Sequence, residues 1–394
     1  MNVARVETAS SSSVGTPPRP RRIAVVCSLA YSLINFRLDL LRAMVSAGHR
    51  VTAFAPEHDA QVAEVLAANS IGFRTVPMQR TGLSPFADLR TLRALVRAFC
   101  EEGINTVLSY TMKPVIYGGL AGRIARVPER HALMTGLGTI YSPARKRVRH
   151  RLLRALSSRL YAQGLEGTIR VFVYNGADEA DIRSNGMLGA GTRLVRVPGS
   201  GVDLDRFAAT PLPATPVRFL MVSRLLEEKG VREFAAAART MREAGCGARV
   251  RLVGPLDSNP TAITLDEVRS WEAEGILEYC GTTRDVRPFL DEASVFVLPS
   301  AYREGVPRTL LEALAAGRPV ITTDRAGCAD TVEDGRNGLL VPARDAGALA
   351  KAMLRLARDP ASLPAMGKRS REIAEERFDV HRVNRLLLSE MGLI

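Results

Sequence analysis

Residues 293–324 read ASVFVLPSAYREGVPRTLLEALAAGRPVITTD, and this stretch points most directly to the fold class. It begins with a short apolar run (293–300), continues with a segment at helical spacing (309–317), and ends with a second apolar run (318–324). Consecutive parallel strands need a long crossover connection, which is usually a helix. We therefore expect an α/β protein in which helices cover a parallel sheet.

The same alternation runs through the rest of the chain in two blocks. Strand-like runs such as IAVVCS (23–28) and INTVLSY (104–110) alternate with helical segments in the first half. The pattern restarts with VRFLMVSR (217–224), directly after the Pro-rich stretch PLPATP (211–216). This restart predicts two doubly wound, Rossmann-like domains facing a central cleft, with a ligand at the carboxyl ends of their strands.

The composition divides the 394 residues into four segments. Residues 1–20 are rich in Ser and Pro and lack apolar periodicity, so we expect a flexible leader. Residues 21–205 and 206–378 hold the two predicted domains. Residues 379–394 form a closing helix that we expect to return to the first domain.

Charge is distributed unevenly between the two halves. Residues 1–200 hold 27 basic and 13 acidic side chains, whereas residues 201–394 hold 27 and 28. The whole chain has a formal net charge of +13, and this excess of positive charge lies in the first half. Such a half would be attracted to a polyanion: an acidic membrane surface, a phosphorylated substrate or nucleic acid.

Two further observations exclude other classes. The five cysteines form no C-x-x-C pair, which argues against a disulfide framework or a structural zinc site and favours a reducing compartment. No window approaches the ~18 consecutive apolar residues of a membrane-spanning helix. We expect a cytoplasmic protein whose membrane contact, if any, is peripheral.

The clearest local motif is Glu304-Gly-Val-Pro-Arg-Thr-Leu-Leu-Glu312, which spans the change from loop to helix after a strand. Free N–H groups and the positive dipole end of that helix suit a phosphate, and Glu312 would lie beside it within reach of ribose hydroxyls. The alternative is an acidic helix terminus that only balances the helix dipole.

A second motif, SRLLEEKG (223–230), places Arg224 and Lys229 between a strand end and a helix start. Two cations there can neutralise a diphosphate without a metal, although ordinary solvated surface charges would give the same pattern. The Gly-rich bend PGSGVD (198–203) would let backbone approach a ligand, or it is a generic loop.

These motifs occur in one order, and in that order the chain resembles family 4 glycosyltransferases of the GT-B fold. The resemblance covers about residues 22–390 and is most specific in the second half. The first-half motifs SLINFRLDLL, SYTMKPVIYGGLAGRIA and LMTGLGTIY are similar to those of enzymes that extend undecaprenyl-diphosphate-linked sugars, including capsule glycosyltransferases.

The resemblance implies a role for each matching residue. Arg224 and Lys229 would hold the donor diphosphate and Glu304 the donor-sugar hydroxyls, which makes these three the catalytic candidates. Glu312 would bind ribose. The backbone of the segment between the glutamates would line the sugar and phosphate: Gly305, Val306, Pro307, Arg308, Thr309 and Leu310. No aspartate pair for a metal accompanies them, so no metal or cofactor is expected.

The first domain departs from the family pattern at two places. The stretch SLAYSLINF (28–36) stands where many members have a Gly-rich turn, and Thr135 stands where many have His. The resemblance implies that the acceptor lies against the N-terminal domain, so Thr135 is counted among the residues expected to contact the acceptor. Arg37 and Lys113 follow predicted strand ends in the same domain and are further candidates for an acceptor phosphate.

The segment 143–163 is basic and contains no acidic residue. Val148, Leu152, Leu156 and Leu160 recur on one helical stripe, which we expect to pack on the domain. The cations around it would then face anionic lipid or the acceptor diphosphate, or they form a solvated face. Nucleic acid is not expected as a partner, because no aromatic residues interleave with the charges. The cations assigned to this surface are Arg145, Lys146, Arg147 and Arg149.

The sequence thus leads to a specific expectation. The protein is a retaining glycosyltransferase that moves a hexose or N-acetylhexosamine from a UDP-sugar to a polyprenyl-diphosphate-linked saccharide at the inner face of the cytoplasmic membrane. Surface polysaccharide synthesis, of capsule or lipopolysaccharide, is the implied setting. The alternatives are a soluble glycosyltransferase with a small-molecule or non-lipid glycan acceptor and, more remotely, a noncatalytic nucleotide- or nucleic-acid-binding protein.

Overall fold

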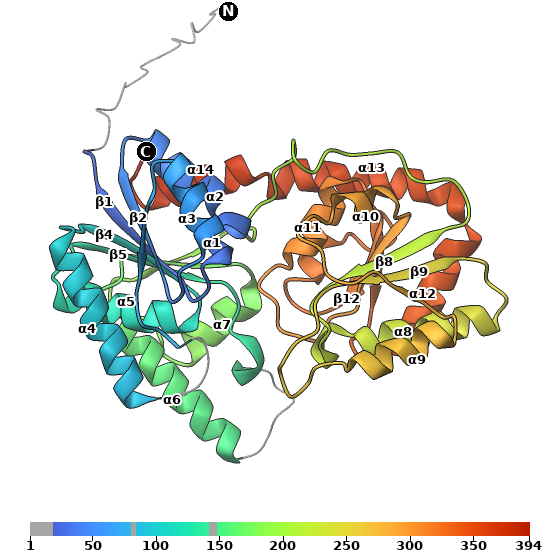
Figure 1. The fold of residues 1–394 in the computed structure, drawn as a ribbon, viewed down its shortest axis with the longest axis horizontal. Coiled ribbons are helices and arrows are strands. Elements are labelled where there is room, and N and C mark those ends of the chain that lie inside the picture. Colours follow the sequence, from blue (N-terminus) through green and yellow to red (C-terminus); the bar gives the residue numbers. More distant parts are fainter. Residues whose placement is uncertain (1–18, 80–83, 142–147) are drawn as a thin grey trace, which may run out of the picture.

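The computed structural model describes residues 19–79, 84–141 and 148–394. Two α/β domains lie side by side, each built on a parallel sheet with helices on both faces (Figure 1). This confirms the predicted fold class of two Rossmann-like domains.

The N-terminal sheet has seven strands in the order β3-β2-β1-β4-β5-β6-β7. The side chains of β1 are apolar on both faces of the sheet, so both faces are covered. Ile23 and Val25 belong to one apolar core, and Ala24 and Val26 belong to another on the opposite face. The strands are β1 (Arg22–Val26), β2 (Arg50–Ala55), β3 (Gly72–Thr75), β4 (Thr106–Tyr110), β5 (Glu129–Met134), β6 (Arg170–Val173) and β7 (Arg193–Arg196).

Glycines allow the helices of this domain to approach one another closely. A Cβ on Gly119 would lie 2.8 Å from the carbonyl carbon of Gly164, so only glycine permits this contact between α5 and α6. The helices are α1 (Tyr31–Phe36), α2 (Leu38–Ser46), α3 (Ala60–Ala68), α4 (Pro85–Glu101), α5 (Met112–Ile124), α6 (Val148–Leu165) and α7 (Gly176–Ser184).

The C-terminal sheet has six strands in the order β10-β9-β8-β11-β12-β13. These strands are β8 (Arg218–Val222), β9 (Arg249–Val253), β10 (Glu278–Tyr279), β11 (Val295–Leu298), β12 (Val320–Thr323) and β13 (Gly338–Val341). The helices around them are α8 (Val231–Glu243), α9 (Leu265–Ala273), α10 (Arg287–Asp291), α11 (Arg308–Ala315), α12 (Ala346–Arg358) and α13 (Leu363–Ile373).

The chain passes between the domains twice, and the two crossings are bonded to each other. The Val202 N–H donates to the Phe378 carbonyl (2.7 Å), and the Val380 N–H donates to the Val202 carbonyl (3.0 Å). Helix α14 (Val380–Glu390) then returns to the N-terminal domain and packs against α2 (Figure 1). Glu390 binds Arg170 at 3.1 Å there. The predicted leader lies almost wholly outside the described residues.

The basic helix α6 packs differently from the sequence prediction. Leu152 is 66% exposed and Leu156 is 47% exposed, so the predicted leucine stripe is not the buried face. The buried side of α6 carries Ser157, Ser158 and Tyr161 instead. The reason is the close contact with α5 at Gly164, which requires small residues, and the 3.0 Å hydrogen bond between Ser158 and Tyr141.

Candidate active site

Two of the three predicted catalytic residues are in direct contact at the carboxyl edge of the C-terminal sheet. The Lys229 ammonium pairs with the Glu304 carboxylate, which also accepts a hydrogen bond from Ser300 Oγ at 2.9 Å. Both side chains are largely buried, at 16% and 12% exposure. A charge pair in this position is strong, because little water screens it.

Local backbone geometry brings Lys229 to this position. A short 3-10 turn, Glu227–Lys229, follows β8 and ends at Gly230, whose φ is +79°. A Cβ on Gly230 would lie 2.8 Å from the carbonyl carbon of Pro299 at the end of β11. Only glycine therefore allows the turn to dock on β11 and to hold Lys229 beside Glu304.

Arg224 lies at the exposed rim of the same edge. Its side chain is about half exposed and pairs with Asp257 at 3.0 Å. Burial raises the pKa of the Tyr302 hydroxyl, Glu304 raises it further and Arg224 opposes both. Arg224 thus contributes positive charge to the region around Tyr302, whose ring also lies 5.7 Å from the Lys229 ammonium.

The predicted donor-binding residues surround the start of α11, with Pro307 preceding its first turn. Glu312 is buried and accepts a hydrogen bond from Arg308 Nε at 3.1 Å. Burial raises the pKa of the Glu312 carboxyl, and the Arg308 charge opposes the increase. The side chain of Leu310 is core, so only its backbone can line a ligand; Thr309 is partly exposed and Val306 packs against Gly199.

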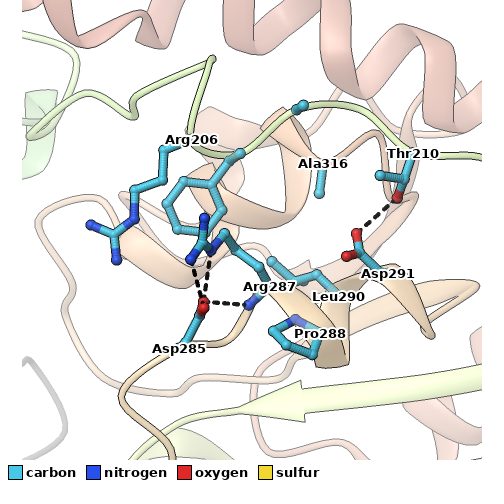
Figure 2. A pocket seen from close by; sticks show the side chains of 10 residues that line it. Arg206, Thr210, Asp285, Arg287, Pro288, Leu290, Asp291 and Ala316 are labelled. Atoms are coloured by element: carbon cyan, nitrogen blue, oxygen red, sulfur yellow. Dashed lines mark hydrogen bonds and ion pairs between the residues drawn. The ribbon is translucent and has the colours of Figure 1, made fainter.

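A pocket of about 350 Å³ lies between residues 206–210 and α10 (Figure 2). Arg206 and Asp285 line it, and the charges of both act on the Glu312 carboxyl. Asp285 accepts two hydrogen bonds from the Arg287 side chain, at 2.8 and 2.7 Å. The pocket's remaining lining is mostly apolar: Phe207, Ala208, Thr210, Pro288, Leu290, Asp291 and Ala316.

The N-terminal domain meets this site through the loop that contains Thr135. Residues 301–306, here called the donor loop, lie directly against it. A Cβ on Gly305 would lie 2.6 Å from the Tyr174 ring and 2.9 Å from the Thr135 carbonyl carbon. The structure therefore brings the Thr135 loop and the donor loop to the same interface.

The other predicted acceptor residues are placed differently. Arg37 is buried, donates a hydrogen bond to the Tyr174 hydroxyl and lies 5.2 Å from the Tyr110 ring centre. Lys113 is buried and binds Asp88 of α4 at 2.9 Å, so its charge is already paired. Arg145, Lys146 and Arg147 lie outside the described residues, as does the side chain of Arg149.

Four residues at this interface were missed by the sequence analysis. Arg303 of the donor loop pairs with Asp178 and Asp181 of α7, and Asn175 donates to the carbonyls of Glu304 and Gly305. The only sequence signal is Asn175 followed three residues later by Asp178, which is typical of a helix start. That signal locates α7 but does not identify partners more than 120 residues away in the chain.

Two Rossmann-like domains that meet near the carboxyl ends of the strands, with a lysine paired to a glutamate there, have the architecture of a GT-B enzyme. Two family models match the chain: "Glycosyl transferase 4-like domain" at residues 35–199 and "Glycosyl transferases group 1" at residues 216–359. Together the two models match most of the chain, which therefore belongs to the family 4 glycosyltransferases and is an enzyme of that class.

The chain is similar to bacterial proteins that are named as glycosyltransferases. N,N'-diacetylbacillosaminyl-diphospho-undecaprenol alpha-1,3-N-acetylgalactosaminyltransferase of Campylobacter jejuni is 24% identical over 82% of this chain and 86% of that protein. The putative colanic acid biosynthesis glycosyltransferase WcaL of Escherichia coli is 35% identical, over 51% of this chain and 52% of that protein.

Solved structures share the fold at lower identity. Sucrose-phosphate synthase from Thermosynechococcus elongatus superimposes with a TM-score of 0.73 at 22% identity, covering 94% of this chain and 98% of that chain. HepE of Anabaena in complex with UDP superimposes with a TM-score of 0.73 at 18% identity, covering 95% of this chain and 100% of that chain.

Proposed function

We propose that this glycosyltransferase moves a hexose or N-acetylhexosamine from a UDP-sugar, with retention of configuration, to a polyprenyl-diphosphate-linked saccharide in bacterial surface glycan synthesis. The observation that most supports the proposal is the buried Lys229–Glu304 pair, positioned where the two domains meet. The UDP bound in HepE and the acceptor named for the Campylobacter relative support the donor and acceptor classes.

The proposed chemistry places the cations at the leaving group. The bond between the anomeric carbon and the diphosphate oxygen breaks, and the acceptor oxygen bonds to the same carbon on the same face. The acceptor proton passes to the departing diphosphate. Arg224 and Lys229 stabilise the negative charge that develops there, an effect that is usually a large part of catalysis. Glu304 holds donor-sugar hydroxyls, and Glu312 holds the ribose.

The same cations replace a divalent metal in this proposal. An ammonium and a guanidinium supply positive charge and hydrogen-bond donors to a diphosphate. EDTA should therefore leave the transfer rate unchanged. A strict requirement for Mg²⁺ or Mn²⁺ would contradict this part of the proposal.

Transfer assays with purified protein test the donor and the site together. The donors are UDP-glucose, UDP-galactose and their N-acetylamino forms, and the acceptor is a polyprenyl-diphosphate-linked saccharide. Lys229→Ala and Glu304→Gln should each reduce transfer by at least a hundredfold. Lys351→Ala, which alters an exposed lysine on α12, should retain it. Full activity of either site variant would remove the site assignment.

We further propose that the N-terminal domain binds an anionic membrane surface through an apolar ridge. The term ridge here means the exposed apolar side chains of α6 and α4, two helices that both pack against α5. No helix within residues 19–79, 84–141 and 148–394 is long and apolar enough to cross a bilayer. The ridge residues are Leu152, Leu153, Leu156, Phe86 and Leu89.

Charge complementarity supports a membrane as the partner. Arg151 and Arg159 on α6 and Arg90 and Arg93 on α4 are exposed beside the ridge. An amphipathic helix with leucines and arginines on its exposed side binds anionic lipid by both burial and charge.

Vesicle sedimentation tests the membrane proposal. Vesicles containing 30% phosphatidylglycerol should bind the protein at low salt, neutral vesicles should not, and Leu152→Ser with Leu156→Ser should weaken binding at least tenfold. Ile124→Ser, which changes an exposed residue at the far end of α5, is the control. Absence of vesicle binding, together with transfer to a water-soluble glycan, would identify the soluble alternative instead.

A further inference from the structure

The side chain of Arg303 crosses from the C-terminal domain to the N-terminal domain. One Nη atom pairs with Asp181 and donates to the Tyr141 carbonyl at 2.8 Å, and the other pairs with Asp178 at 3.3 Å. The Arg303 side chain is 14% exposed and that of Asp178 is 1% exposed. The interaction is therefore nearly dry, where a charge without its partner is costly.

Asn175 holds the backbone of the same loop. Its amide nitrogen donates to the carbonyl oxygens of Glu304 (3.1 Å) and Gly305 (3.0 Å), and also to Asp178 (3.0 Å). Its side-chain oxygen accepts from the Asp178 N–H at 2.8 Å, which fixes the amide orientation. One buried side chain thus bonds the two consecutive peptide groups on either side of the Gly305 Cα.

These contacts divide the support of Glu304 between the two domains. The carboxylate is held within its own domain by Lys229 and Ser300, whereas its main-chain carbonyl is held by Asn175 of the other domain. If the N-terminal domain shifts relative to the donor loop, the backbone of Glu304 must shift as well. The position of the carboxylate therefore depends on how the domains are docked.

The same network continues to the basic helix. Asp181 also binds Arg154 of α6 at 3.1 Å, and Tyr141, whose carbonyl accepts from Arg303, bonds Ser158 of α6 through its hydroxyl at 3.0 Å. The path from α6 to the donor loop is thus a continuous series of charged and polar contacts.

We propose that Arg303, Asn175, Asp178 and Asp181 are positioning residues that set the catalytic geometry of Glu304 by docking the donor loop on the N-terminal domain. The proposal rests on the proposed function, because it assumes that Glu304 acts on the donor sugar. It assigns these four residues to the transfer step rather than to nucleotide binding, since none of them belongs to the diphosphate or ribose candidates.

The test compares Arg303→Met and Arg303→Lys with Arg170→Met. Arg170 pairs with Glu390 on α14 and lies at the opposite, amino-terminal edge of the sheet, so its variant controls for the loss of one ion pair away from the donor loop. Arg303→Met should reduce kcat for UDP-sugar transfer at least tenfold and keep the Kd for UDP within threefold of wild type. Arg303→Lys, which keeps the charge, should recover part of kcat.

A second readout does not depend on transfer. Hydrogen exchange of residues 301–306 should be at least tenfold faster in Arg303→Met than in wild type and unchanged in Arg170→Met. Unchanged exchange in Arg303→Met, or an equal loss of UDP affinity and kcat, would overturn the proposal. A wild-type protein without transfer activity, but with the expected exchange result, would instead refute the proposed function and leave the docking contact established.

Discussion

Replacing Gly305 by alanine should separate the two domains at the donor loop. The added Cβ would lie 2.6 Å from the Tyr174 ring and 2.9 Å from the Thr135 carbonyl carbon, distances that real Cβ atoms essentially never show. Neither neighbour can move easily, because Thr135 contributes backbone and the Tyr174 hydroxyl is bonded by Arg37. The loop also packs tightly against Gly327 of its own domain, where a Cβ would lie 2.7 Å from the Glu304 carbonyl oxygen.

The size of the effect follows from this geometry. Overpacking a tight contact by one methyl group typically costs about 1–3 kcal/mol. Because the clash is between domains, opening of the cleft relieves it, so the cost falls on the closed arrangement and not on the folding of either domain. A bias of about 1–3 kcal/mol reduces the closed population roughly 5- to 150-fold relative to the open one.

The assay measures both transfer and shape. Gly305→Ala should reduce the rate of sugar transfer by roughly 5- to 150-fold. It should also increase the radius of gyration in X-ray scattering, with little change in the thermal unfolding midpoint. Gly247→Ala is the matched control, because its Cβ would meet nothing within 4 Å. If Gly305→Ala transfers sugar within twofold of Gly247→Ala, the observed contact is not part of the active arrangement.

Two further predictions concern buried charge. Burial raises the pKa of the Asp178 carboxyl from 3.8 to about 6, with the Arg303 charge opposing the increase. Between pH 3.8 and about 6, the folded protein keeps a proton on Asp178 that the unfolded chain releases. This group therefore lowers the free energy of unfolding of the wild-type protein as the pH rises, by at most about 3 kcal/mol. Asp178→Asn should remove that slope in urea unfolding at pH 4, 5 and 7, and an unchanged slope would contradict the assignment. Arg318 is fully buried and donates to the Pro211 carbonyl at 3.3 Å, in the Pro-rich stretch 211–216. Arg318→Ala should lower the free energy of unfolding by about 2–5 kcal/mol in urea titration, as for other large-to-small core changes, whereas a loss below 0.5 kcal/mol would exclude a structural role.

The strands and helices were predictable because each depends on local sequence. In residues 293–324, the two apolar runs became β11 and β12, and the segment between them became α11. The motifs at Lys229 and Glu304 were also predictable, since each follows a strand end and parallel strands bring their carboxyl ends to one edge.

Features that depend on packing between distant segments were not predictable. The leucine stripe of α6 has the spacing of a buried face, but the contact between Gly119 and Gly164 turns another face toward α5. The partners of Arg303 lie in the other domain, and nothing in its local sequence distinguishes this arginine from a solvated one. Residues with ordinary local patterns can thus acquire their role only when the domains dock.

Thermal unfolding in the presence of UDP is the most direct test of whether the site binds a nucleotide. If Arg224, Lys229 and Glu312 form a nucleotide site, UDP at ~100 times its Kd should stabilise the wild-type protein by about 2.7 kcal/mol. One UDP-sugar should stabilise it as well, and Lys229→Ala should lose most of both effects. Equal stabilisation of wild type and Lys229→Ala, or no shift with any UDP compound, would contradict the account of the site.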